Sequence, residues 1–312
     1  MSARGASVLV VGETLVDIVH TPDGAVSEHV GGSPANVAMG IARLGHPTTL
    51  ATTLGDDDHG TRCREQIEDH GVRIDNLDAG NHATSTAVAT LDESGAATYD
   101  FDLHWDLRPV TGLERIGHVH TGSIAATLTP GESVVTETLV AARPHGTVSY
   151  DPNVRPTIMG SADEIRGRIE EIVALSDVVK ASEDDIDFLY AGESLPEVMS
   201  RWASRGPSLV VVTRGGDGVT WLTRSGPDGA STTGEAPARV DTVADTVGAG
   251  DSFMAGLVSG LLDAGLLGDA SARERLATAG TDEVWPAIDR ALATSAVTVT
   301  RDGAYAPTRE EL

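Results

Sequence analysis

The sequence is poor in cysteine and aromatic residues. Its one cysteine, Cys63, excludes an internal disulfide and a metal site built from several cysteines. Cys63 falls in a predicted helix, where we expect a small, buried apolar residue. Aromatic residues make up only 4% of the 312 residues while 40% are hydrophobic, so the core must consist mainly of Ala, Val, Leu and Ile. The length suits one large α/β domain or two average ones.

Lysine is almost absent, since Lys180 is the single example among 22 basic residues. A Walker A loop requires a Gly-Lys-Ser/Thr sequence, and a protein-kinase core requires a lysine on its third strand. Lys180 follows two valines and has no glycine before it. Both of these nucleotide-binding designs are therefore excluded.

Basic charge and long apolar runs are also missing. Forty-seven acidic residues against 22 basic ones give a net charge of -25, which would repel a phosphate backbone or an anionic bilayer. No segment approaches the roughly 20 apolar residues of a membrane span, and residues 1–5 lead into a predicted strand without an apolar leader. We expect a cytoplasmic protein that binds neither nucleic acid nor membrane. A salt-rich habitat and a GC-rich genome would each explain the acidity.

Alternating strand and helix patterns predict a largely parallel sheet covered by helices. Residues 8–11 form an apolar run typical of a strand buried on both faces, and Ser33 is predicted to cap the helix that follows. Two β-prone pairs, 15–19 with 25–30 and 86–90 with 98–102, predict a small projecting sheet. The remaining predicted elements are strands at 48–54, 117–121, 147–151, 177–180, 208–213, 219–222 and 239–243, and helices at 34–44, 61–70, 132–142, 163–175, 195–204, 249–262 and 285–296.

The segment 245–252, Asp-Thr-Val-Gly-Ala-Gly-Asp-Ser, is a small-residue turn that opens a helix. Unpaired amides at a helix start attract an anion, and glycines let a phosphate approach closely. Phe253 stands where a dinucleotide fingerprint requires its third glycine, so that motif fails. Asp251 would oppose a bound phosphate, unless it accepts the proton of an attacking hydroxyl. Alternatively, Asp251 caps the helix and Asp245 is a turn residue.

Two motifs resemble the signatures of the ribokinase-like (PfkB) carbohydrate kinases. Residues 245–251 are similar to the C-terminal signature, and residues 31–38, Gly-Gly-Ser-Pro-Ala-Asn-Val-Ala, to the N-terminal one, roughly 200 residues earlier. The resemblance extends from about residue 8 to 307. It implies one kinase domain over 1–312, an α/β/α sandwich with a mostly parallel central sheet and a small β lid within about 13–31 and 83–106. It also implies ATP and Mg²⁺, with K⁺ in many members.

The resemblance assigns the chemistry to the C-terminal signature. Asp251 would be the catalytic base, and the backbone N–H groups of Gly248, Ala249 and Gly250 would form the anion hole for the migrating phosphoryl group. Preorganised N–H dipoles and a metal ion meet the developing charge in such a site. This arrangement explains how a kinase works without a cradle lysine.

The sugar-binding positions of the family match Asp17, Gly32, Asn36 and Arg155. Asp17 follows the first strand and would accept hydrogen bonds from sugar hydroxyls. Asn36 instead could bond nearby backbone, and Gly32 could serve mainly as the turn that lets a lid close. Arg155 ends an Asp-Pro-Asn-Val-Arg segment after a predicted strand, where it would neutralise phosphate or form a surface salt bridge.

The nucleotide side of the site is implied by shorter motifs. By resemblance, nucleotide-binding positions are Lys180, Ser182, Thr213, Gly215 and Gly218. Ser182 and Asp185 replace the Asn and Glu of the family's Asn-x-x-Glu element, so Asp185 would act on magnesium through water.

Simpler explanations remain open for two of these assignments, the segment 182–185 and Lys180. A solvated acidic helix start explains the segment 182–185 equally well, and Lys180 could pair with these acids. The turn with Asp245 and Val247, together with Gly303, resembles the family's monovalent-cation loop. The ten histidines show no metal-ligand spacing.

Several functions remain open at this stage. The leading hypothesis is a transferase, an ATP-dependent fructokinase that makes fructose 6-phosphate, because the segments at 12–13, 120–123 and 151–155 resemble fructokinase-type members. The next candidates are 2-keto-3-deoxygluconate kinase and ribokinase. A regulator that binds sugar or nucleotide without turnover belongs to a different class, and a dinucleotide-dependent oxidoreductase is disfavoured by the failed fingerprint. Family resemblance also implies a homodimer through the lid.

Overall fold

The computed structural model describes residues 6–93, 96–225, 230–240 and 242–312. Its main sheet has nine strands in the order β13-β12-β11-β10-β9-β8-β1-β4-β5. Seven neighbouring strands are parallel and the last two at one edge are antiparallel. The strands are β1 Val8–Val11, β4 Thr48–Thr52, β5 Arg73–Asn76, β8 His118–Gly122, β9 Thr147–Asp151, β10 Val178–Ser182, β11 Leu209–Thr213, β12 Val219–Ser225 and β13 Ala230–Ala236.

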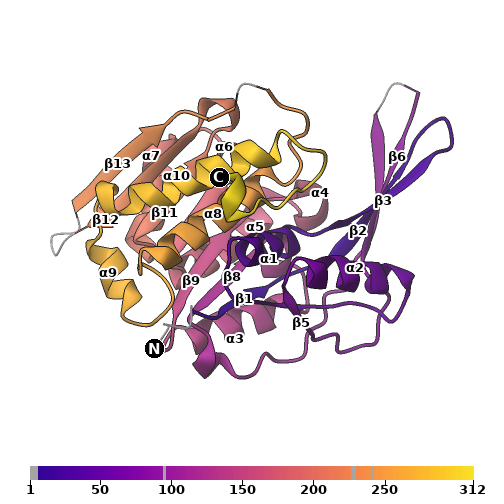
Figure 1. Cartoon of the computed structure of the whole chain (residues 1–312), viewed down its shortest axis with the longest axis horizontal. Helices are drawn as coiled ribbons and strands as arrows, with labels where there is room; N and C mark the ends of the chain where they lie inside the picture. The colour runs from indigo at the N-terminus through magenta and orange to yellow at the C-terminus, as the bar shows by residue number, and fades with distance from the viewer. Residues whose placement is uncertain (1–5, 94–95, 226–229, 241) are drawn as a thin grey trace.

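A second sheet of four strands projects from one side of the body (Figure 1). It is formed by β2 Leu15–His20, β3 Val26–Gly31, β6 Thr86–Leu91 and β7 Ala97–Asp102, in the order β3-β2-β6-β7. Both predicted strand pairs are confirmed, while part of the predicted turn at 92–95 lies outside the described residues. We call these four strands the lid sheet.

Helices cover both faces of the main sheet, which gives three layers (Figure 1). Successive residues of β1 show why, because Val8 and Val10 join one hydrophobic cluster and Leu9 and Val11 join the other. The first cluster contains side chains of α1, α2, α8, α9 and α10, and the second those of α3, α5, α6 and α7. The helices are α1 Ser33–Arg43, α2 Asp58–Asp69, α3 Glu132–Ala142, α4 Pro156–Met159, α5 Ala162–Leu175, α6 Glu183–Leu189, α7 Leu195–Arg205, α8 Ala249–Asp263, α9 Ala272–Thr278 and α10 Thr281–Thr298.

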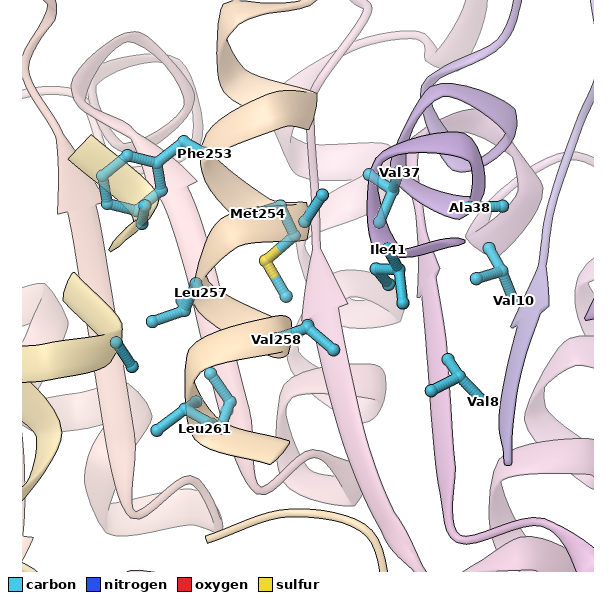
Figure 2. Packing of buried hydrophobic residues seen from close by; sticks show 14 of the residues in the cluster. Val8, Val10, Val37, Ala38, Ile41, Phe253, Met254, Leu257, Val258 and Leu261 are labelled. Atoms are coloured by element: carbon cyan, nitrogen blue, oxygen red, sulfur yellow. The ribbon is translucent and has the colours of Figure 1, made fainter. Parts of the chain in front are cut away.

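The helices α1 and α8 lie side by side, as Figure 2 shows for Ile41 and Val258. A Cβ on Gly40 would lie 2.6 Å from the Cβ of Ala255, so the two helix backbones approach closely. Both helices begin at the same edge of the sheet. Their packing therefore brings the two sequence signatures together in space.

The expected α/β/α fold with a small β sheet is confirmed, and three local predictions are corrected. Residues 239–240 and 242–243 form no strand; the partner of β12 is β13 at Ala230–Ala236, a polar edge strand without an apolar pattern. Gly32, not Ser33, is the N-cap of α1, and no side chain caps that helix start. The predicted helix 285–296 begins earlier, at Thr281.

The structure also describes the surroundings of Cys63 and the apolarity of the helices. Cys63 is fully buried in α2, as predicted, and burial raises the pKa of its thiol to about 12. Among the helices of the described residues, none combines the length and apolarity that a membrane span requires.

Candidate active site

The carboxyl ends of the parallel strands and the N-termini of α1 and α8 meet at one edge of the main sheet. Ligands of α/β proteins bind at such an edge. At this edge the lid sheet joins the body, since β3 ends at Gly31 and α1 begins two residues later. The two signatures predicted from the sequence therefore belong to one site.

Asp251 is held by two side chains of α1. The hydroxyl of Ser33 donates to Oδ1 of Asp251 at 2.6 Å, and the amide Nδ2 of Asn36 donates to Oδ2 at 2.8 Å. Asp251 is half-buried. The amide oxygen Oδ1 of Asn36 is buried and has no hydrogen-bond partner among the described residues. This acceptor is therefore available to a ligand hydroxyl.

The start of α8 differs from the anion hole predicted from the sequence. Gly248 is the N-cap in the left-handed region, with φ 74°. The N–H of Ala249 donates to the carbonyl oxygen of Thr246 at 3.2 Å. The N–H groups of Gly248 and Gly250 have no protein acceptor within the described residues. Two of the three expected amides can therefore receive an anion directly, and that of Ala249 closes the turn.

Asp17 lies on β2 of the lid sheet, and Arg155 lies four residues after the end of β9. Burial raises the pKa of Asp17, while the charges of His29 and Arg155 act to lower it. A Cβ on Gly31 would lie 2.2 Å from Oδ2 of Asp17, so this carboxylate packs against the end of β3. Gly32 has φ 102°, and its Cβ would meet the carbonyl oxygen of Glu13 at 2.5 Å. Of these predicted sugar-side residues, Gly32 contacts Asn36 directly, because its carbonyl oxygen accepts from the N–H of Asn36 at 3.0 Å.

Glu13 is a site residue to which sequence reasoning gave no role. It follows β1, is 5% exposed, and accepts a hydrogen bond from the N–H of Ala125 at 3.2 Å. Burial raises the pKa of Glu13 to about 8, against hydrogen bonds including that of Ser123, and the charge of Asp251 adds a small increase. A carboxyl group directly after a buried strand was the available signal, but its burial depends on residues more than 100 positions away.

Lys180 lies beneath the start of α8 and not on an open nucleotide cleft. Its Nζ donates to Oδ2 of Asp151 at 2.8 Å, and the two side chains are 4% and 1% exposed. Burial alone would lower the pKa of Lys180, but Asp151 reverses the direction and raises it. A Cβ on Gly250 would lie 3.1 Å from Nζ, so the ammonium group lies next to Gly250 in the first turn of α8. The predicted direct contact with nucleotide does not fit this buried pairing.

Asp185 and Ser182 form a capping box at the start of α6. Oδ2 of Asp185 accepts from the N–H and the hydroxyl of Ser182, at 2.8 and 2.7 Å. Oδ1 accepts from the N–H of Val154 at 2.7 Å. Every oxygen of this buried carboxylate thus has a protein donor. The structure ties the segment 151–155 to α6, and a magnesium role for Asp185 stays a prediction.

The other predicted nucleotide-binding residues lie at the end of β11 and in the turn after it. Thr213 ends this strand and its hydroxyl donates to the carbonyl oxygen of Ala181 at 3.4 Å. Gly215 and Gly218 have φ values of 52° and 94°, and a Cβ on Gly218 would lie 2.0 Å from the carbonyl oxygen of Ala236. These glycines are required by the turn itself. Their contact with a nucleotide is a separate prediction.

The predicted cation loop is closed by hydrogen bonds. Asp245 accepts from the N–H of Val247 at 3.0 Å and from the N–H of Gly303 at 2.8 Å. These hydrogen bonds lower the pKa of Asp245. The C-terminal segment and the turn before α8 are therefore joined through one carboxylate, as the resemblance implied, although no cation binding follows from this alone.

The site suits a metal that is held mainly by substrate. Within the described ranges, no group of three or more His, Cys, Asp or Glu side chains is placed to hold a metal ion. Mg²⁺ in phosphoryl-transfer sites commonly uses one or two carboxylates, water and substrate phosphates. The half-buried Asp251 beside two unpaired amides fits a metal–nucleotide complex of that kind.

A three-layer α/β/α body, a lid sheet at the carboxyl edge and a carboxylate in the first turn of α8 are the features expected of the carbohydrate kinases that the sequence resembles. The chain belongs to the pfkB family of carbohydrate kinases, whose model matches residues 6–311. It is 32% identical over 270 residues to a fructokinase of Klebsiella pneumoniae, which covers 82% of this chain and 85% of that protein.

Solved structures of fructokinases superpose on this chain over almost its whole length. A fructokinase of Xylella fastidiosa with bound ATP superposes with a TM-score of 0.81 at 25% identity, covering 98% of this chain and 96% of that one. A fructokinase double mutant of Vibrio cholerae, with fructose, ADP and potassium ion bound, gives a TM-score of 0.79 at 26% identity, covering 99% of this chain and 98% of that one. The oxidoreductase hypothesis is set aside by this membership.

Proposed function

We propose that the protein is an ATP-dependent fructokinase that transfers the γ-phosphoryl group to the primary hydroxyl of fructose. The observation that carries the proposal is the placement of Asp251, which lies in the first turn of α8 and is bonded to Asn36 of α1. A carboxylate there can accept a proton from an acceptor hydroxyl next to amides that receive a phosphoryl group. The relatives with the name fructokinase support this choice of sugar.

Different residues of the chain would have different roles in the phosphoryl transfer. ATP with Mg²⁺ supplies the activated phosphoryl group and neutralises part of its charge when bound. Asn36 and Asp17 would orient the sugar, and the amides of Gly248 and Gly250 would meet the charge on the transferred group. Asp251 would take the proton of the hydroxyl as the new oxygen–phosphorus bond forms. Because Lys180 lies next to Gly250, its positive charge would strengthen the anion hole.

The lid sheet supports an unphosphorylated sugar. Residues 13–31 and 81–106 contain no lysine or arginine. A second phosphate on the substrate would require cationic side chains there. His29 and Arg155 are the residues whose positive charges act to lower the pKa of Asp17. The proposal therefore names fructose rather than a phosphorylated sugar.

The lid sheet also supports a proposed homodimer. Val26 and Tyr99 are 55% and 57% exposed on this sheet, and the ring of Tyr99 stacks on that of Phe101 with centroids 5.8 Å apart. Exposed apolar groups on a projecting sheet are typical of an interface between chains. Sedimentation of the full chain at several concentrations would test the dimer.

A coupled assay of ADP release tests the proposed function. We expect rapid turnover with fructose in the presence of Mg²⁺, and slow turnover with ribose, 2-keto-3-deoxygluconate and fructose 1-phosphate. Asp251→Asn should lower kcat by at least about 100-fold, the usual scale for loss of a general base, while fructose binding is retained. Asp184→Asn, an exposed change on α6, is the matched control. Turnover with another sugar alone would contradict fructose but not the kinase, and undiminished turnover in Asp251→Asn would contradict the base.

A further inference from the structure

Ser33 stands where a helix cap is expected, but its hydroxyl is used elsewhere. It is the first residue of α1, and no side chain caps this helix. The Ser33 hydroxyl instead donates to Oδ1 of Asp251, 218 positions along the chain, at 2.6 Å. Among the described residues, the Ser33 side chain makes no other hydrogen bond. The hydroxyl proton is thus committed to the carboxylate of Asp251.

The direction of the Ser33 side chain is fixed by its neighbours. Gly32 has φ 102° and packs on the backbone of Glu13, where any Cβ would collide. Pro34, the next residue, packs so closely on Gly12 that a Cβ there would lie 2.2 Å from its ring. The residues on both sides of Ser33 are therefore held against the end of β1. A hydroxyl on so rigid a support can orient a partner without a large entropy cost.

The two donors to Asp251 are not equivalent. Ser33 and Asn36 lie three positions apart on α1 and so share a face, and each bonds a different oxygen of the carboxylate. Asn36 also presents a buried amide oxygen that has no hydrogen-bond partner among the described residues, so its side chain can engage a ligand. Its amide group can turn from Oδ2 to a substrate hydroxyl. Ser33 has no second polar atom with which to do so.

We infer that Ser33 is a positioning residue for Asp251: it anchors Oδ1 and leaves Oδ2 to receive the proton from the acceptor hydroxyl. This inference rests on the proposed function. In the step concerned, the hydroxyl oxygen bonds to the γ-phosphorus, the bond from that phosphorus to ADP breaks, and the hydroxyl proton moves to Oδ2. Ser33 takes no part in bond making and acts through Asp251 alone.

The variants Ser33→Ala and Ser33→Thr test this role in the full chain. Ser33→Ala removes the donor and should lower kcat by about 10- to 100-fold, the scale expected for a lost hydrogen bond to a charged group, with the KM for sugar changed less than about threefold. Ser33→Thr retains the hydroxyl and should recover most of kcat. Asn36→Ala, in contrast, should raise KM.

Three outcomes would overturn the inference. Ser33→Ala with kcat within about twofold of the parent would show that the bond does not matter for turnover, and an equal loss of kcat in Ser33→Thr and Ser33→Ala would point to packing instead. Crystal structures of the parent and Ser33→Ala provide a readout that needs no turnover. The inference requires the Asp251 carboxylate to rotate in Ser33→Ala, and an unchanged orientation would refute it even if the substrate proves not to be fructose.

Discussion

Glu13 gives the sharpest test of the electrostatics of this site. The change is Glu13→Gln, which keeps the size of the side chain and resembles the protonated acid. Glu13 is buried at the end of β1, and burial raises its pKa from the ordinary 4.5 to about 8. Glu13 is therefore expected to carry a proton in the folded protein at neutral pH, although it lies close enough to Asp251 to sense its charge.

The size of the effect follows from proton linkage. Between pH 4.5 and about 8 the folded chain holds a proton on Glu13 that the unfolded chain releases. The contribution to stability is thus full below pH 4.5 and is lost as pH rises toward 8. Each pH unit in this window lowers the free energy of unfolding by about 1.4 kcal/mol, or on the order of 5 kcal/mol in all. Glu13→Gln removes this dependence because its amide does not titrate.

Urea unfolding of the parent and Glu13→Gln, from pH 5 to 9, measures the difference directly. The stability of Glu13→Gln relative to the parent should rise across the window by about 1.4 kcal/mol per pH unit and level off above pH 8. Glu137→Gln removes an exposed charge from α3 and serves as the matched control, with no such rise. Parallel curves for the parent and Glu13→Gln would refute the claim that burial keeps Glu13 protonated.

Two further predictions concern the charges beneath and beside α8. Lys180→Met should lower the free energy of unfolding by about 3–5 kcal/mol, because Asp151 is left buried without its cation; urea unfolding measures this, and a loss below about 1 kcal/mol would contradict the buried pair. Asp245→Ala removes the acceptor for the amides of Val247 and Gly303 and should cost about 1 kcal/mol of stability, since the group is only half-buried. The same variant should lose any stimulation of ADP release by K⁺ over Na⁺, and retention of the full response would remove Asp245 from the cation loop.

Part of the fold was predictable because some buried strands, such as Val8–Val11 and Leu209–Thr213, are short apolar runs. The run Val8–Val11 and the parallel strands after it end at glycine or polar residues, which marks both their length and their site-facing edge. The strand Ala230–Ala236 was not predictable in this way. It lies at the sheet edge and is built of Ser, Thr, Gly and Glu between alanines, so one face gives no apolar signal.

The two signatures predicted the chemistry of the site but not its hydrogen bonds. The resemblance of residues 31–38 and 245–251 to two signatures of one family implied that both serve one site, and the packing of α1 on α8 provides the contact. Ser33 was expected to cap its own helix because serine at a helix start usually does. Only the tertiary structure places Asp251 within 2.6 Å of it, where a charged acceptor competes with the backbone.

The acids at the carboxyl edge differ in how their charge is compensated. Glu13 is neutralised by a proton, as its raised pKa indicates. Asp151 is paired with Lys180 and fully buried. Asp185 accepts three hydrogen bonds from Ser182 and Val154. Each of these three carboxyl groups is thus compensated within the protein, although Oδ1 of Asp151 has no hydrogen-bond partner among the described residues.

The negative charge of Asp251 is compensated by hydrogen-bond donors that a ligand can replace. Its two donors are neutral side chains, and one of them also offers a buried amide oxygen to which no group in the described part of the chain donates. Half-burial leaves it reachable from the site, whereas Asp151 and Asp185 are closed off. A base must exchange a protein donor for a substrate hydroxyl without leaving a buried charge unpaired. Among these acids Asp251 meets that requirement, which supports the proposal that it is the base by an argument separate from the sequence motif.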